Sequence, residues 1–325
     1  MRKTASSTRE TLSRQVSAPR RPQARPSSVR LFARQRLLLR LLETLGGRAG
    51  KMDFQKFLFL YCQEPSSGQP YEFVPYMFGA FSFTSYADRR KLVERGLLAD
   101  DDSWLLTGEG RQAAVDSPSD TRLEAFARSW GSLHGDALVA ETYRRFPYYA
   151  TRSEIAEQIL AGDRPALREI EAARPPKKSS ILYTIGYEGH SLERYLNTII
   201  RAGTTILCDV RRNPLSRKYG FSKTTLSRAC EGVGIRYEHI PELGIASDHR
   251  RELDSQESYD ALFDVYERDY LPGQVESIRT IQRWVTGGEC VALTCYEHLP
   301  HQCHRHCVSD ALAELSSGAF VAQHL

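Results

Sequence analysis

The sequence predicts an α/β domain, with a mostly parallel sheet flanked by helices, preceded by a winged-helix-like α+β domain. In residues 181–325, short apolar runs rich in β-forming residues alternate with helical segments, which is the pattern of a parallel sheet. In residues 31–150, helical segments come first and two short apolar runs follow. With 325 residues, 41% of them hydrophobic and 26% charged, the chain can bury the cores of about two domains.

The first 30 residues differ from the rest in charge. They hold eight basic side chains and one acid, a net charge of +7, so residues 31–325 carry −3 of the total of +4. Three prolines oppose a helix here, which predicts a disordered basic tail over residues 1–30. The alternative is a mitochondrial transit peptide, which would also be rich in Arg and Ser and poor in acids. The acidic remainder argues against a broadly basic nucleic-acid coat protein.

The composition also bears on the compartment. No stretch approaches the roughly 18 apolar residues that cross a bilayer. The longest Leu-rich run, residues 37–45, is interrupted by Arg40 and Glu43. The seven cysteines are an odd number and lack the spacing of a disulfide framework, so we expect reduced thiols. These observations predict a cytoplasmic protein without a membrane partner.

The first folded segment, residues 31–150, shows three helices in order. Leucines in residues 37–45 form the buried stripe of a helix that two glycines end. Aromatic and aliphatic residues mark a second helix over 52–62, and Thr84 or Ser85 can cap a third that ends at Gly96. Two apolar runs around an acidic turn then predict a hairpin over 97–107. Three helices followed by a hairpin is the order of a winged helix.

The third of these helices would be the recognition helix of such a domain. It carries Arg89, Arg90 and Lys91, which could contact DNA phosphates or the major groove. Alternatively, these charges solvate an ordinary helix of a protein–protein adaptor. Residues 31–150 hold equal numbers of acids and bases, and the aspartates at 100–102 would repel a phosphate backbone. The sequence leaves both alternatives open.

A connection follows over residues 151–180. Two helical pieces, 153–160 and 165–173, precede a linker at 174–180 with two prolines, three bases and no apolar side chain. The α/β domain then begins at residue 181. Its expected strands are residues 181–187, 204–210, 235–240 and 290–295; its expected helices are residues 191–201, 222–231, 258–266, 275–285 and 303–315.

Ligands of a parallel α/β sheet bind at the carboxyl ends of its strands, so the residues found there are candidates for the site. The second strand ends in Asp209, and the loop 211–223 after it holds five bases, two aromatics and no acid. Arginine forks suit phosphate, and Tyr219 or Phe221 could stack on a base. The alternative is a surface loop whose arginines pair with Asp209 and nearby glutamates.

The last strand ends at Cys295, and Cys303 and Arg305 open the closing helix. A thiol beside a helix N-terminus and an arginine has a lowered pKa, which a nucleophile needs. The same region offers Cys295, Cys303 and Cys307 as a zinc set with a histidine, although the spacing fits no common zinc template. Thirdly, the thiols could simply fill the core. We assign no metal site and no cofactor from the sequence.

Four motifs carry a resemblance to a known family. They are TIGYEGHS (184–191), DVRRNPLSRKYGFS (209–222), IRYEHIPELG (235–244) and LTCYEHLPHQCHR (293–305). By their order and spacing, the domain resembles the bacterial and archaeal domain-of-unknown-function family 488. The resemblance implies an α/β domain with shared polar positions at Asp209, Arg211, Pro214, Arg217, Tyr237, Gly244, Cys295, Glu297, Cys303, His304 and Arg305. It also implies an association with nucleic acid. Residues 31–150 are similar, more weakly, to winged-helix modules of prokaryotic regulators.

These observations favour a nucleic-acid-associated protein whose α/β domain binds a phosphate-containing or nucleobase ligand, with nucleic-acid processing or modification as the candidate reaction. The alternatives are a non-catalytic winged-helix regulator with a ligand-sensing domain and a thiol-dependent small-molecule hydrolase. The expected partner is DNA or another nucleic acid. Candidate catalytic residues are Asp209, Cys295, Glu297 and Cys303; candidate phosphate- or nucleic-acid-binding residues are Arg211, Arg217, Lys218, Tyr219, Tyr237, His304, Arg305, Arg89, Arg90 and Lys91.

Overall fold

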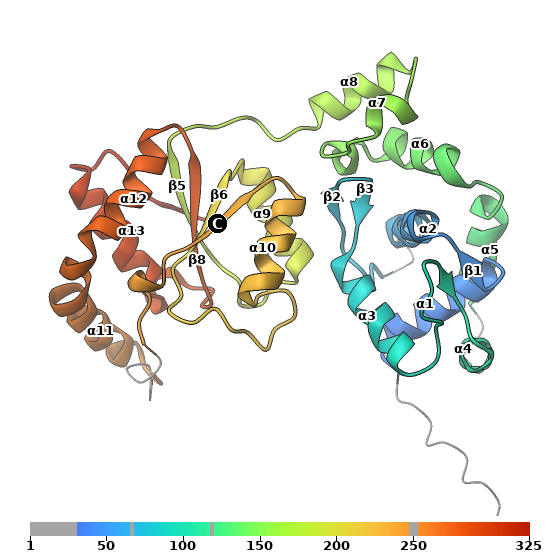
Figure 1. Cartoon of the computed structure of the whole chain (residues 1–325), viewed down its shortest axis with the longest axis horizontal. Helices are drawn as coiled ribbons and strands as arrows, with labels where there is room; N and C mark the ends of the chain where they lie inside the picture. The colour runs from blue at the N-terminus through green and yellow to red at the C-terminus, as the bar shows by residue number, and fades with distance from the viewer. Residues whose placement is uncertain (1–30, 66–67, 118–119, 247–252) are drawn as a thin grey trace, which may run out of the picture. The chain divides into compact units, whose positions relative to one another are not determined.

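The computed structural model describes residues 31–65, 68–117, 120–246 and 253–325 (Figure 1). The predicted basic tail, residues 1–30, lies outside the described residues. Residues 33–325 form one compact unit that contains every helix and strand given below. None of the helices in this unit is long and apolar enough to cross a membrane.

The N-terminal part contains the three helices that the sequence predicts. Its elements are α1 (Ala33–Thr44), β1 (Arg48–Ala49), α2 (Lys51–Gln63), β2 (Val74–Tyr76), β3 (Gly79–Phe81), α3 (Phe83–Glu94), β4 (Trp104–Leu105), α4 (Gly108–Val115), α5 (Thr121–Trp130) and α6 (Gly135–Arg145). The expected hairpin over 97–107 is reduced to one bridge, Leu98 with Leu106, and β4 pairs with β1 instead. A second hairpin, β2 with β3, was not expected. The assignment to the winged helices therefore stays a prediction.

The connection is short and helical. It contains a 3-10 turn (Pro147–Ala150), α7 (Ala156–Ile159) and α8 (Arg164–Ala172), followed by irregular chain up to residue 180. Asp163 caps α8 by accepting a hydrogen bond from the backbone of Ala166. The two predicted helical pieces are thus present, each shifted by one to three residues at its ends.

The C-terminal part is the predicted α/β domain. All pairs in its five-stranded sheet are parallel, and the strand order is β7-β6-β8-β5-β9. The strands are β5 (Ile181–Gly186), β6 (Ile206–Asp209), β7 (Arg236–His239), β8 (Cys290–Cys295) and β9 (Gln323–His324). The sequence did not predict β9, which has only two residues and is polar and exposed.

Helices cover both faces of this sheet (Figure 1). On one face α9 (Leu192–Ala202) and α10 (Lys223–Gly232) pack against alternate strand residues such as Tyr183 and Ile185. On the other face α11 (Gln256–Val265), α12 (Val275–Thr286) and α13 (Arg305–Leu315) pack against Leu182 and Leu293. Successive strand residues point to opposite faces, so these apolar runs are buried on both sides.

The N-terminal part and the α/β domain share packing. Val74 of β2 belongs to the same buried cluster as α9 and α10. Glu193, in the first turn of α9, is 1% exposed and accepts hydrogen bonds from the backbone N and hydroxyl of Thr84, at 2.7 and 3.0 Å. The Glu193 carboxylate therefore accepts hydrogen bonds from the first turn of α3, where backbone N–H groups lack helical partners and the helix dipole favours negative charge. Burial raises the pKa of Glu193, and these hydrogen bonds oppose that shift.

Candidate functional site

A pocket of 880 Å³ lies at the carboxyl ends of β5, β6 and β8, and we call it the strand-end pocket. Its wall combines the segment after β6 with the residues that end β5 and β8. Those residues are Tyr187, Arg211, Arg212, Asn213, Leu215, Ser216, Arg217, Lys218, Ile245, Leu253, Tyr259, Cys295, Tyr296 and Glu297. The candidates Arg211, Arg217, Lys218, Cys295 and Glu297 thus meet around one space.

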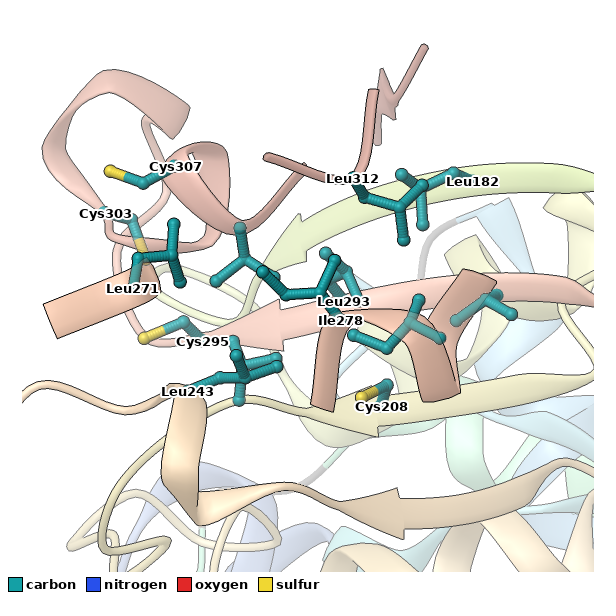
Figure 2. Close-up of a cluster of buried hydrophobic side chains, with 14 of the residues drawn as sticks. Leu182, Cys208, Leu243, Leu271, Ile278, Leu293, Cys295, Cys303, Cys307 and Leu312 are labelled. Atoms are coloured by element: carbon teal, nitrogen blue, oxygen red, sulfur yellow. The ribbon is translucent and has the colours of Figure 1, made fainter. Parts of the chain in front are cut away.

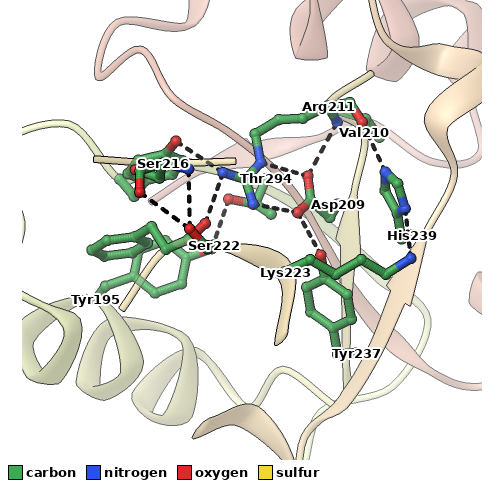
Figure 3. A network of polar contacts seen from close by, with 12 residues as sticks. Tyr195, Asp209, Val210, Arg211, Ser216, Ser222, Lys223, Tyr237, His239 and Thr294 are labelled. Atoms are coloured by element: carbon green, nitrogen blue, oxygen red, sulfur yellow. Dashed lines mark hydrogen bonds and ion pairs between the residues drawn. The ribbon is translucent and has the colours of Figure 1, made fainter. Parts of the chain in front are cut away.

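Behind this wall, Asp209 forms a buried polar network (Figure 3). Its carboxylate is completely buried and accepts two hydrogen bonds from the Arg211 guanidinium, at 2.8 and 2.5 Å. The Tyr237 hydroxyl donates to the same carboxylate at 2.6 Å. A two-point pair of this kind fixes the orientation of both side chains. Asp209 does not line the pocket; its hydrogen bonds position Arg211 and Tyr237, and a catalytic role for it stays a prediction.

The N–H groups of the Arg211 guanidinium form hydrogen bonds to other groups of the protein. Besides Asp209, its guanidinium donates to the Tyr187 hydroxyl at 2.8 Å and to the backbone oxygen of Phe221 at 2.9 Å. Burial lowers the pKa of Arg211, but the hydrogen bonds and charge of Asp209 outweigh it and raise that pKa overall. The predicted phosphate contact through Arg211 therefore has little support, because Arg211 builds the wall of the pocket. His239 also helps to hold Arg211 in place, because its Nε2 donates a hydrogen bond to the Arg211 backbone oxygen (Figure 3). The other ring nitrogen of His239, Nδ1, accepts a hydrogen bond from the Lys223 ammonium.

The remaining cations of the loop are available to a ligand. Arg217 is exposed and has no hydrogen-bond or ion-pair partner in the described chain. Arg212 is exposed, and within the described chain its side chain makes a single hydrogen bond, 3.4 Å long, to the Pro241 backbone oxygen. Lys218 donates to the Tyr187 backbone oxygen at 2.9 Å, and partial burial lowers its pKa. The positive charge at the pocket mouth therefore comes from Arg212, Arg217 and Lys218.

The floor of the pocket is formed by the end of β8. The Cys295 Sγ lies 3.4 Å from a Glu297 carboxylate oxygen and 3.7 Å from His304 Nδ1. The other nitrogen of His304, Nε2, lies 2.9 Å from the backbone oxygen of Val210. Because a carbonyl oxygen only accepts, Nε2 carries the proton and Nδ1 presents a lone pair to Cys295. Cys295, Glu297 and His304 therefore form a buried group of donors and acceptors at the pocket.

Cys303 and Arg305 lie behind this floor and do not line the pocket. Burial raises the pKa of the Cys303 thiol well above its ordinary value, the opposite of the expected shift. The Arg305 guanidinium donates to the backbone oxygens of Glu297 at 2.5 Å and His298 at 2.9 Å. Burial thus disfavours the thiolate form of Cys303, and the Arg305 guanidinium points two of its donors at backbone oxygens; the predicted roles of both residues stay predictions. Arg305 fixes the chain at Glu297 through these hydrogen bonds.

Two groups of side chains have the composition of metal ligands among the described residues. Cys295, Cys303 and His304 are all buried and have their ligand atoms within 4.8 Å of one another. Cys307 belongs to a separate group with Glu267 and His306, so the structure does not bring it together with Cys295 and Cys303, the set considered from sequence. Figure 2 shows Cys295 at the end of β8, and Cys303 and Cys307 beyond it.

The other predicted nucleic-acid-binding residues lie outside the strand-end pocket. The Tyr219 hydroxyl donates to the Phe83 backbone oxygen at 3.0 Å, and the Phe221 ring stacks on Tyr187 with centroids 4.3 Å apart. Arg89 donates to the backbone oxygens of Asp101 and Ser103, so it holds the acidic turn. Arg90 and Lys91 are exposed on α3. Tyr237 and His304 also lie behind the wall rather than on it.

Sequence reasoning missed several residues that line the pocket, among them Tyr187, Asn213, Tyr259 and Tyr296. Tyr187 and Tyr296 directly follow β5 and β8, and their rings meet edge to face at 5.3 Å. Their position after parallel strands was a usable signal. Tyr259 lies on α11, and nothing in its local sequence distinguishes it.

The comparisons with known proteins agree with this part of the fold. Residues 191–312 match the family model described as "Domain of unknown function DUF488". No curated protein and no solved structure matches the chain. The α/β domain of this chain therefore belongs to the DUF488 family.

Proposed function

We propose that this is a nucleic-acid-associated protein whose α/β domain binds a phosphate-containing or nucleobase ligand in the strand-end pocket. One observation carries the proposal: Arg212, Arg217 and Lys218 lie on the same pocket as Cys295 and Glu297. Arg211 also lines the pocket, but its charge is balanced by Asp209. Three cations face one carboxylate, Glu297, so the pocket favours an anion.

Aromatic side chains support a nucleotide over a simple inorganic anion. Tyr296 is 44% exposed, and Tyr187 and Tyr259 line the same pocket. A base can stack on such rings while arginine and lysine side chains hold its phosphates. The volume of 880 Å³ is also within the range of pockets that bury small organic ligands.

The N-terminal part offers a second, weaker site for nucleic acid. Arg90 and Lys91 are exposed on α3, which the sequence predicts as a recognition helix, and Arg95 is exposed directly after it. Phosphate contacts through such side chains would position DNA without reading its sequence.

A ligand-sensing regulator remains the second candidate, and one contact favours it. Tyr219 lies in the loop 211–223, which lines the pocket. Its hydroxyl donates a hydrogen bond to the backbone oxygen of Phe83, the first residue of α3. A ligand that moves this loop would therefore act on the helix predicted to meet DNA. In that case nucleotide binding would change DNA affinity, whereas independent sites would leave it unchanged.

The test is fluorescence anisotropy with labelled single-stranded and duplex DNA. It compares the full chain with a chain that begins at residue 31, because the first 30 residues carry +7. Binding by the shorter chain, displaced by an unlabelled nucleotide, supports the pocket. Loss of all binding with the tail would mean that the tail alone holds DNA, and it would contradict the proposal.

A further inference from the structure

We propose that Cys295, Cys303 and His304 bind a zinc ion whose fourth coordination position opens onto the strand-end pocket. The inference goes beyond the proposed function, because zinc binding requires neither a phosphate nor a nucleic acid. It rests on the geometry of the three side chains, on the hydrogen bond that orients the histidine and on the side from which the group is reached.

The geometry fits a tetrahedral ion. The three ligand atoms lie within 4.8 Å of one another, and the Cys295 Sγ is 3.7 Å from His304 Nδ1. Zinc–sulfur and zinc–nitrogen bonds at tetrahedral angles place sulfur and nitrogen roughly 3.6 Å apart. The side chains therefore need little movement to close around the ion.

The hydrogen bonding of His304 is typical of a metal-binding histidine. His304 Nε2 donates to the Val210 backbone oxygen at 2.9 Å, which leaves Nδ1 unprotonated and facing the thiols. Metal-bound histidines commonly donate their second N–H to a carbonyl or carboxylate in this manner. His304 is 1% exposed, so its ring orientation is also fixed by packing.

The charge suits a buried position. Zinc displaces one proton from each thiol, and the two thiolates then balance the 2+ charge of the ion. All three ligands are completely or almost completely buried, where a site of zero net charge avoids most of the cost of removing an ion from water. Soft thiolate and imidazole ligands also favour zinc over magnesium or calcium.

The pocket gives the ion a way in and an open side. Cys295 and Glu297 line the strand-end pocket, while Cys303 and His304 close the group from behind. Three protein ligands with one open position is the arrangement of catalytic zinc sites. A water in that position could pass a proton to the Glu297 carboxylate, which lies 3.4 Å from the Cys295 Sγ.

The second group, Glu267, His306 and Cys307, fits zinc less well. Glu267 is exposed, and His306 Nδ1 already lies 2.7 Å from the Cys303 backbone oxygen. This second group offers one thiol rather than two. It is the alternative zinc site that the experiment below must distinguish from the first.

The first measurement uses the full wild-type chain. Metal is removed with a chelator and cobalt(II) is added, because cobalt reports tetrahedral thiolate coordination through its visible bands and its sulfur-to-metal charge-transfer band. We expect these bands to saturate at about one cobalt per chain, and zinc to abolish them. Azide should shift the bands by entering the open position. No charge-transfer band would overturn the proposal, and bands insensitive to azide would contradict the open position.

Variants then locate the ion by elemental analysis of zinc-loaded protein. Cys303→Ser should lower the zinc content from about one per chain to roughly a tenth of that, and Glu297→Gln should keep it. The matched control is Cys290→Ser, at the opposite end of β8 and equally buried. Zinc kept in Cys303→Ser but lost in Cys307→Ser would assign the ion to the second group and overturn the proposal. Equal losses in Cys303→Ser and Cys290→Ser would also contradict it.

Discussion

Asp209 and Arg211, two residues apart at the end of β6, hold each other in a buried two-point ion pair at 2.8 and 2.5 Å. The pair engages most of the polar atoms of both side chains inside the protein, although Arg211 still lines the pocket. It also aims Arg211 at Tyr187, whose ring lies 5.0 Å from the guanidinium carbon. The polar residues after β6 therefore divide into an inner layer that builds the pocket and an outer layer of Arg212, Arg217 and Lys218 that faces it.

Asp209→Asn should destabilise the protein strongly. The change keeps the shape of the side chain but leaves the buried Arg211 without its counter-charge. Breaking a buried pair from one side costs about 3–5 kcal/mol of the unfolding free energy. Urea denaturation would measure this. Arg217→Gln is the control, because Arg217 has no partner in the described chain and its loss should change stability by less than about 0.5 kcal/mol. Equal stabilities for the two variants would contradict the role of the pair.

Gly186→Ala should disturb the pocket floor. A Cβ added at Gly186, the last residue of β5, would lie 1.8 Å from the Glu297 backbone oxygen. Backbone on both sides must then move, at a cost of roughly 1–3 kcal/mol. Thermal unfolding would show the loss. A Cβ at Gly273 meets no atom within 4 Å, so Gly273→Ala should leave the melting temperature nearly unchanged. A Gly186→Ala protein as stable as Gly273→Ala would show that the close approach is unimportant.

Lys56 should make stability depend on pH. It is 2% exposed, its ammonium donates to the backbone oxygens of Phe78 and Ala80, and burial lowers its pKa from 10.5 to about 7. Below pH 7 both the folded and unfolded chains bind this proton, so the cost of burying the charge is fully present there. Between pH 7 and 10.5 only the unfolded chain binds it, so stability rises with pH.

The comparison with Lys56→Met isolates this effect. The unfolding free energy of the wild type minus that of the variant should increase by roughly 2 kcal/mol between pH 7 and pH 9. Urea denaturation at these two pH values measures it. The same difference at both pH values would mean that Lys56 titrates normally.

The sequence predicted the sheet and the sheet edge at which the strand-end pocket lies, because both follow from local patterns. Apolar runs alternating with helices are visible in the chain, and parallel strands bring Arg217, Cys295 and Glu297 to one edge. What each side chain does there depends on tertiary partners. The pairing of Arg211 with Asp209, the burial of Cys303 and the use of Arg305 on the Glu297 backbone are set by packing that no local pattern reveals.

In the N-terminal part, too, local sequence patterns revealed the helices but not the tertiary pairing of the strands. The helices over Ala33–Thr44, Lys51–Gln63 and Phe83–Glu94 are periodic and were predicted. The strand pairing was not, because β1 and β4 have two residues each and pair across more than 50 residues of chain. Short strands carry too little pattern to be distinguished from loops.

The most direct test of the ligand pocket is the affinity of single-stranded DNA for Arg217→Gln/Lys218→Gln at two salt concentrations. Each lost charged contact is worth about 1.5–3 kcal/mol, so binding should weaken at least about tenfold. The slope of log affinity against log salt should become shallower by roughly 1.4. Arg283→Gln, on the exposed side of α12, should match the wild type. Wild-type affinity and slope in the double variant would contradict a phosphate-binding pocket at the strand ends.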